Sequence, residues 1–135
     1  MSLPSHEEII DDLEFFDDWE QRYQYIIDLG KQIPGLEESE CTPDRLVKGC
    51  QSNVWLKADF TDGQIHFSVD SDAVIVQGLL ALVMAAYNDK TPKEILDFDI
   101  EGYFATLDLE SHITPTRGNG LRSIVGKIRE LAILC

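Results

Sequence analysis

The chain has 135 residues, of which 44% are hydrophobic and 27% are charged, and its formal net charge at pH 7 is −14. A length and composition in this range predict one globular domain, spanning residues 1–135 and built on a single hydrophobic core. The strong negative charge repels phosphate backbones and therefore argues against a nucleic-acid partner.

The N-terminal quarter of the chain predicts two amphipathic helices. The first, over residues 5–15, begins with the capping-box pattern S-x-x-E. The second, over residues 18–33, carries apolar residues at helical spacing and is expected to stop at Pro34 and Gly35. Acidic residues crowd both helices, either as a solvated face or as a patch that steers docking onto a basic partner.

The middle of the chain predicts a β-hairpin. Apolar and polar residues alternate over residues 54–70 on both sides of a D-G turn signal. A two-residue turn pairs Phe60 with Ile65 and places the apolar residues of both strands on one face. His66 then lies opposite Asp59 and is expected to form a cross-strand pair with it.

The most apolar segment, residues 73–87, predicts a buried central helix capped by Ser71 or Asp72. It is interrupted by Gln77 and Gly78 and is shorter than the roughly 20 residues that a bilayer requires. The N-terminus also lacks the basic and apolar regions of a signal peptide. These features predict a cytoplasmic protein that does not contact a membrane.

Three more helices are expected after the central one. A capping box with proline at the first helical position opens the first of them at residues 91–94, and the second covers residues 100–107. The last helix begins at either Thr114 or Asn119, since both fit its start. Helices, then an antiparallel hairpin, then helices is an α+β order, with a small antiparallel sheet flanked by helices.

Three cysteines, Cys41, Cys50 and Cys135, set the possible thiol chemistry. An odd number without a signal peptide argues against a disulfide scaffold. Their wide spacing argues against a zinc or iron–sulfur site built from this chain alone. A structural role for all three thiols and a reactive role for one of them both remain open.

The residues around Cys50 distinguish it from the other two cysteines. Gly49 gives the backbone freedom for a tight bend, and Gln51 and Ser52 supply polar groups for a thiolate or a terminal sulfur. These residues alone support a buried structural cysteine and a reactive one equally. The sequence places no histidine next to Cys50, which argues against a Cys–His hydrolase.

Four segments, in order along nearly the whole chain, resemble the SufE family of sulfur acceptors. Residues 47–55, V-K-G-C-Q-S-N-V-W, resemble the family signature G-C-Q-S-x-V-W, although Asn53 stands where glutamine is more usual. Residues 19–30 resemble its W-E-x-[KR]-Y…L-G helix, and residues 70–79 resemble its D-S-D-A-x-I-V-x-G-L segment. Residues 114–121 resemble its [ST]-P-x-R-x-x-G-L stretch.

This resemblance implies a fold like those of SufE and NifU (IscU) proteins and a role in sulfur transfer. Cys50 would accept persulfide sulfur from a cysteine desulfurase of the SufS or CsdA kind, stimulate that enzyme, and pass sulfur on for iron–sulfur cluster assembly. The downstream partner would be a cluster scaffold or another sulfur acceptor. Pyridoxal phosphate would belong to the desulfurase, so we expect no cofactor in this chain. The acceptor would be a monomer or weak dimer and not an independent catalyst.

The resemblance also implies how the site works. The cysteine would be tucked into an apolar pocket, which protects a persulfide but disfavours the reactive thiolate. Docking would swing the loop outward, with Gly49 as the hinge. Arg117 is either a surface arginine at a helix start or a group that steadies the Cys50 thiolate or anchors the partner. Of Asp70 and Asp72, one would cap the central helix and the other would hold the Cys50 loop or Arg117.

Two alternative functions stay open. A cluster scaffold of the NifU/IscU kind needs about three cysteines within ligand reach. A regulator that binds the desulfurase without carrying sulfur would not need Cys50. The sequence fits the SufE type and the closely similar CsdE type equally.

Overall fold

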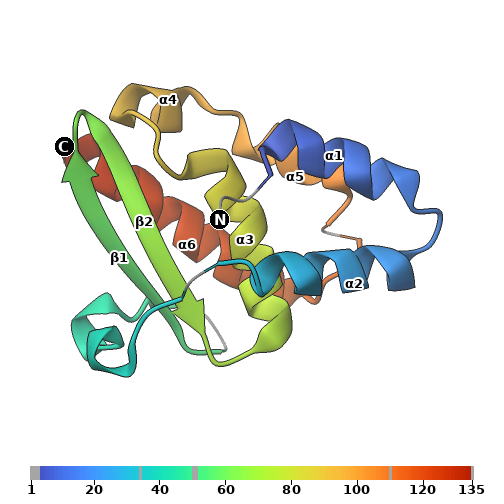
Figure 1. The fold of residues 1–135 in the computed structure, drawn as a ribbon, viewed down its shortest axis with the longest axis horizontal. Helices are drawn as coiled ribbons and strands as arrows, with labels where there is room; N and C mark the ends of the chain where they lie inside the picture. Colours follow the sequence, from blue (N-terminus) through green and yellow to red (C-terminus); the bar gives the residue numbers. More distant parts are fainter. Residues whose placement is uncertain (1–3, 34, 50–51, 110, 135) are drawn as a thin grey trace.

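The structure, a computed structural model, describes residues 4–33, 35–49, 52–109 and 111–134. It confirms the α+β class, because helices precede and follow one antiparallel hairpin (Figure 1). The elements are α1 (His6–Phe15), α2 (Trp19–Gly30), η1 (Glu38–Glu40), η2 (Pro43–Arg45), β1 (Val54–Thr61), β2 (Gln64–Ser71), α3 (Val74–Tyr87), α4 (Pro92–Asp97), α5 (Ile100–Leu107) and α6 (Pro115–Leu134).

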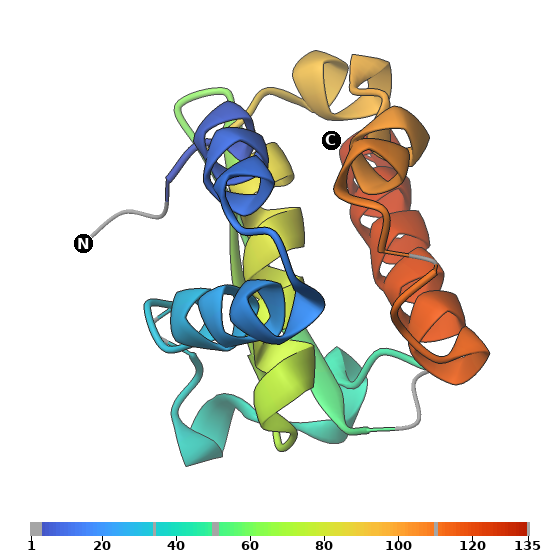
Figure 2. The ribbon, with the colours of Figure 1, turned by 90° about the vertical axis from the view of Figure 1, so that its right-hand side faces the viewer.

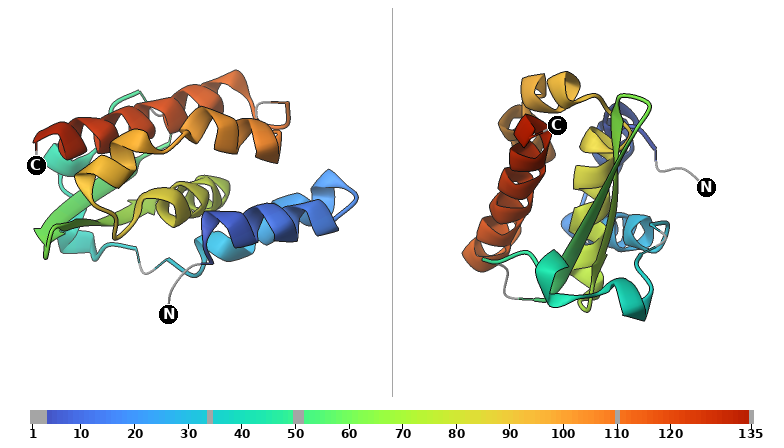
Figure 3. Two further views of the ribbon diagram at one scale, coloured as in Figure 1. Left: turned by 90° about the horizontal axis from the view of Figure 1, so that it is seen from above. Right: turned by 90° about the vertical axis from the view of Figure 1, so that its left-hand side faces the viewer.

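Helix α3 is the central element of the hydrophobic core. Leu80, Ala81, Leu82 and Val83 are consecutive and have no exposed surface, so this helix is covered all round, as predicted. Figure 2 shows α3 between α1 and α2 on one side and α6 on the other. Strand β2 packs against α3 (Figure 3). In the described part of the chain, no helix has the length and apolar character that crossing a membrane requires.

The hairpin has the predicted register. Phe60 pairs with Ile65 across a turn in which Asp62 and Gly63 have φ values of 54° and 79°. Positive φ at both turn residues is the geometry that matches the twist of a hairpin. The apolar face is buried along β2, but Phe60 and the tip of β1 are exposed.

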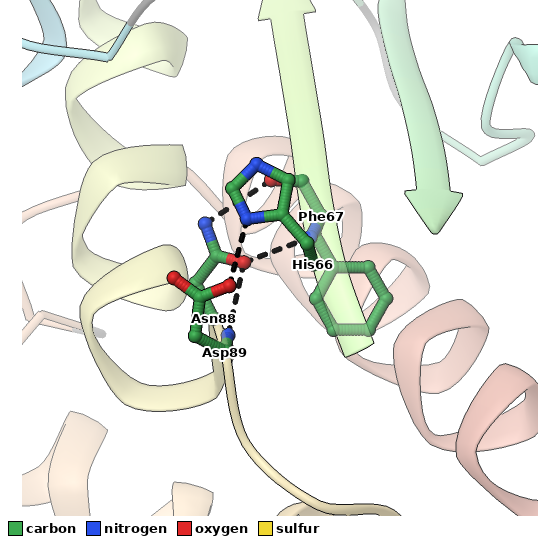
Figure 4. Close-up of polar contacts among 4 residues, drawn as sticks. All are labelled: His66, Phe67, Asn88 and Asp89. Atoms are coloured by element: carbon green, nitrogen blue, oxygen red, sulfur yellow. Dashed lines mark hydrogen bonds and ion pairs between the residues drawn. The ribbon is translucent and has the colours of Figure 1, made fainter. Parts of the chain in front are cut away.

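The expected cross-strand pair of His66 is only half right. His66 does lie opposite Asp59 in the register. Its ring nitrogen Nδ1, however, lies 2.8 Å from a carboxylate oxygen of Asp89, beyond the end of α3. The residues after α3 run beside β2. His66 therefore pairs with Asp89 (Figure 4), which is distant in the sequence, and not with Asp59 of the neighbouring strand.

Two predicted helix ends were wrong. Helix α2 ends at Gly30, where Lys31 and Gln32 close a tight turn. Pro34, the expected stop, lies outside the described residues. Helix α3 begins at Val74, and neither Ser71 nor Asp72 caps it, since its N-cap residue makes no side-chain hydrogen bond.

Of the two predicted starts of the last helix, Thr114 and Asn119, the structure has the earlier one. Helix α6 begins at Pro115, and the Thr114 hydroxyl accepts a hydrogen bond from the backbone N–H of Arg117. Proline at the first helical position loses no intrahelical bond, because that N–H has no partner in a helix anyway. This start places Arg117 in the first turn of α6.

Candidate functional site

A small pocket lies where the beginning of β1, the beginning of α3 and the first half of α6 meet. Its cavity volume is ≈ 20 Å³, which is room for about one water-sized group. The pocket walls are mostly apolar, with two hydroxyl side chains and one arginine at the edge. They are formed by Ser52, Val54, Val76, Leu79, Thr116, Arg117, Gly120, Leu121 and Ile124.

This pocket adjoins the segment that carries the G-C-Q-S sequence. Cys50 and Gln51 themselves lie outside the described residues. Ser52, the first described residue after them, lines the pocket. Gly49, the last described residue before them, approaches the same helix α6 at Ser123.

Gly49 occupies a position that favours glycine for two reasons. Its φ is +92°, in a region that side chains other than glycine rarely adopt. A Cβ atom built there would also lie 2.5 Å from the hydroxyl oxygen of Ser123. The sequence-based expectation of a tight bend at Gly49 agrees with this geometry, and its role as a hinge stays a prediction.

Asp72 fixes the chain immediately after Ser52. Its carboxylate accepts hydrogen bonds from the backbone N–H of Asn53 (3.2 Å) and from the Asn53 side-chain amide (3.1 Å). The start of β1 is thereby held to the start of α3, next to the pocket. Capping is therefore wrong for Asp72. Its predicted role in holding the Cys50 loop or Arg117 stays a prediction, since its described bonds go to Asn53.

Asp70 serves a different part of the fold. Its carboxylate accepts hydrogen bonds from the backbone N–H of Leu36 (3.1 Å) and of Ser71 (2.8 Å), and from the Gln77 side-chain amide. These bonds tie the segment after α2 to the entry of α3. Asp70 is absent from the described pocket lining, and it does not cap α3.

Arg117 is exposed and lines the pocket together with Ser52. The structure thus brings together two predicted site residues that are 65 positions apart in the sequence. The guanidinium group and the N-terminal end of α6 both add positive potential at this edge of a strongly acidic chain. Positive potential of this kind favours a thiolate over a thiol, whereas the apolar pocket walls act in the opposite direction.

Cys41 lies in a less favourable environment for thiol chemistry. It is partly buried in the turn after η1. Burial raises the pKa of its thiol, and the nearby carboxylates of Asp70, Glu40 and Glu38 raise it further. At neutral pH this thiol is therefore mostly protonated and poorly nucleophilic. Cys135 lies outside the described residues.

Three residues that touch this site were not singled out from the sequence. Thr116 and Gly120 line the pocket beside Arg117, one turn apart on α6. Their helical spacing could have identified this face if the start of α6 had been certain. Ser123 meets Gly49 through the tertiary fold alone, and no sequence pattern indicates that contact.

No metal centre is evident in the described ranges. In them, no three His, Cys, Asp or Glu side chains gather closely enough to hold a metal ion. The expectation that this chain carries no cofactor stays a prediction.

These features define a class of small α+β proteins in which the residues next to a G-C-Q-S sequence adjoin an apolar pocket beside a helix N-terminus. The family model for SufE, described as an Fe-S metabolism associated domain, matches residues 7–132. An uncharacterized SufE-like protein of Rhizobium etli is 45% identical over 134 residues, which cover 96% of this chain and 90% of that protein. The chain belongs to the SufE family, as the sequence motifs indicated.

The fold is also shared with a solved structure. The solution structure of a hypothetical protein from Thermus thermophilus matches with a TM-score of 0.78 at 18% sequence identity. The match covers 98% of this chain and 96% of the other. The same arrangement of elements is therefore reached with a very different sequence.

Proposed function

We propose that this protein accepts persulfide sulfur from a cysteine desulfurase onto Cys50, stimulates that enzyme, and passes the sulfur on towards iron–sulfur cluster assembly. The observation that carries the proposal is the position of the G-C-Q-S sequence in a SufE-family chain. The described residues on either side of Cys50 and Gln51 both lie against α6, and Arg117 lines the pocket there.

The transfer needs no oxidant or reductant. The Cys50 thiolate attacks the terminal sulfur of the desulfurase persulfide, and a new S–S bond forms at Cys50. The S–S bond of the donor breaks at the same time, and the donor cysteine leaves as a thiolate with the bonding electron pair. A second transfer of the same kind delivers the sulfur to the next acceptor.

The apolar pocket supports the proposal that the carrier is sheltered when it is free. A persulfide sulfur held against walls such as Val54, Leu79 and Ile124 would be shielded from bulk water and small thiols, which would otherwise remove it. An apolar environment also disfavours the thiolate, so the free protein would react slowly. Docking on the desulfurase would release the loop, with Gly49 as the pivot.

The partners follow from the same proposal. The donor is a pyridoxal-phosphate cysteine desulfurase of the SufS or CsdA kind, and the cofactor stays with that enzyme. The recipient is a cluster scaffold or another sulfur acceptor. We place the reaction in the cytoplasm, where reducing conditions keep unpaired thiols reduced.

Mapping the transferred sulfur tests this function. The protein is incubated with a desulfurase and cysteine, alkylated without reduction, digested and analysed by mass spectrometry. We expect the mass of one additional sulfur on the Cys50 peptide. Stimulation of the desulfurase without added sulfur would support a regulator instead. A stable iron-bearing monomer after anaerobic reconstitution would support a scaffold.

A substitution at Arg117 tests the charge at the pocket edge. We expect Arg117→Gln to slow persulfide formation on Cys50 by about tenfold, because hydrogen bonds to charged groups contribute roughly 1.5–3 kcal/mol. Stability should change little, since Arg117 is exposed. Lys127→Gln removes an exposed charge from α6 away from the pocket and is the matched control. Equal slowing in both variants would contradict a specific role for Arg117.

A further inference from the structure

The first turn of α6 carries part of the candidate site but is not held in place by burial. Residues 114–117 are all exposed, and the first buried residue of the helix is Gly120. Two hydrogen bonds to Thr114 close the turn. Its hydroxyl accepts from the N–H of Arg117 (3.3 Å), and its carbonyl accepts from the N–H of Gly118 (3.0 Å). The position of Arg117 therefore depends on how the chain before Thr114 is fixed.

The connection from α5 to α6 is a compact turn. Asp108 ends α5 with a φ of 54°, and Leu109 is 1% exposed. The N–H groups of His112 and Ile113 both donate to the Leu109 carbonyl, at 2.9 and 3.1 Å. Leu109 anchors the beginning of this turn in the core, whereas His112 and Ile113 at its end are only partly buried. The end of the turn needs a second contact to fix it.

His112 supplies that contact by stacking on Trp19 of α2. The ring centroids are 3.8 Å apart, and the ring planes differ by 13°. Nδ1 of His112 lies 3.1 Å from the carbonyl oxygen of Asp108, and because a carbonyl only accepts, this nitrogen donates. Among the described residues, no other ring contact, hydrogen bond or ion pair joins α2 to the connection. The stack is therefore the specific link between them.

Trp19 is a rigid platform for this stack. It is the first residue of α2, and the Asp18 side chain caps that helix. The ring of Tyr23 packs against the indole at a centroid distance of 5.5 Å. The guanidinium carbon of Arg22 lies 5.3 Å from the centroid of the Trp19 ring, and its Nε donates to the carbonyl of Phe16 (3.1 Å). Since α2 packs against α3, the stack ties the start of α6 to the central helix.

We propose that Trp19 and His112 are positioning residues for sulfur transfer, because their stack holds the first turn of α6 where Arg117 lines the pocket. Neither ring is among the described lining of that pocket, so both act through Arg117. This inference rests on the proposed function, in which the charge of Arg117 favours the reacting thiolate. Small displacements of a charged group from its productive position have large effects on rate.

A pair of substitutions at His112 tests the stack. His112→Leu removes the flat ring but keeps an apolar side chain, whereas His112→Phe keeps a ring that can stack. We expect His112→Leu to slow persulfide formation on Cys50 roughly fivefold, within the effect expected for Arg117→Gln. His112→Phe should restore most of the rate.

His6→Leu is the matched control. Like His112, His6 is partly buried and packs against an aromatic ring, that of Phe98, with centroids 4.9 Å apart. His6 lies in α1 and is absent from the described lining of the candidate pocket. The control should take up sulfur at the rate of the unmodified chain.

A double substitution separates positioning from a general loss of stability. If His112 acts through Arg117, adding His112→Leu to Arg117→Gln should slow the transfer no further, because the group that would be displaced is already missing. A general structural effect would instead multiply the two losses. Circular dichroism establishes that each variant is folded.

Amide hydrogen exchange, followed by NMR, tests the placement of the turn without a desulfurase. We expect His112→Leu to raise the exchange rate of the Gly118 amide at least about fivefold, because its acceptor is the Thr114 carbonyl. The amide of Ile128, a residue of α6 with no exposed surface, should exchange as slowly as before.

The outcomes are distinct. Slower transfer by His112→Leu, its rescue by His112→Phe and the absence of further slowing in the double variant support the proposal. A full transfer rate in His112→Leu overturns it, and so do losses that multiply. If the unmodified chain takes up no sulfur, the proposed function fails instead, and amide exchange decides the placement. Unchanged exchange at Gly118 then overturns it, and faster exchange supports it.

Discussion

Replacing Cys50 with serine is expected to reduce sulfur uptake and desulfurase stimulation by at least ~100-fold, because the nucleophile of a covalent transfer is lost. A serine hydroxyl stays protonated near neutral pH and forms no persulfide. Ser52, Arg117 and the pocket between them remain, so binding to the desulfurase should persist. The measurement is the rate of sulfide release by the desulfurase with and without the variant.

Cys41→Ser is the matched control for this substitution. Partial burial and neighbouring carboxylates raise the pKa of the Cys41 thiol, so it contributes little thiolate at neutral pH. We expect the control to retain nearly full stimulation. Full stimulation by Cys50→Ser would contradict the carrier mechanism and favour a regulator. Loss of stimulation in Cys41→Ser with Cys50 intact would show that the wrong thiol had been chosen.

The hairpin illustrates what the sequence was sufficient to predict. A two-residue turn and strict alternation both constrain the register, and they agreed on the pairing of Phe60 with Ile65. Local signals of this kind also located the capping boxes at Ser5 and Thr91. In each case, the residues that determine the structure lie within a few positions of one another.

The errors lie where the deciding partner is distant in the sequence. Asp72 fits a helix cap by its position, but Asn53, the residue before β1, binds it instead. Phe60 fits a core position by its alternation, but α3 packs against β2 and leaves the tip of β1 exposed. No local sequence pattern predicts which helix packs against a given face of the hairpin.

The sequence suggested the chemistry of the candidate site but not its surroundings. The G-C-Q-S sequence and the family motifs point to Cys50 as the sulfur acceptor and to Arg117 as a supporting residue, and both roles stay predictions. The pocket is formed by residues of three elements that are distant in the sequence. The segment before it is placed next to α6 by the close approach of Gly49 to Ser123. Such contacts follow from packing and can be found only in the folded structure.

The crossing of α2 and α3 predicts a large effect on stability. A Cβ atom on Gly78 would collide with the backbone carbonyl oxygen of Ile26, and the Ile26 side chain would lie 2.7 Å away. Backbone cannot move aside as a flexible side chain can, so the two helices would have to separate. Ile26 and Leu29, both nearly inaccessible, would lose packing as they did so.

We therefore expect Gly78→Ala to lower the free energy of unfolding by about 2–3 kcal/mol, near the upper range for overpacked cores. In urea this lowers the midpoint by roughly 1–2 M at the slopes typical of small proteins. Gly126→Ala, in the exposed face of α6, is the matched control because a Cβ there meets no atom within 4 Å. The control should gain up to about 1 kcal/mol, since alanine has the higher helix propensity. Equal stabilisation by both substitutions would contradict the close helix crossing.

Gly30→Ala tests the same contact from the other helix. A Cβ atom on Gly30 would lie 2.6 Å from the backbone nitrogen of Gly78, so either substitution forces the same separation of α2 from α3. Once one alanine has moved the helices apart, the second should cost less. We therefore expect the double variant to lose clearly less stability than the sum of the two single losses, as residues in direct contact do. Strict additivity would mean that the two glycines relieve separate constraints and that the helices do not meet at this point.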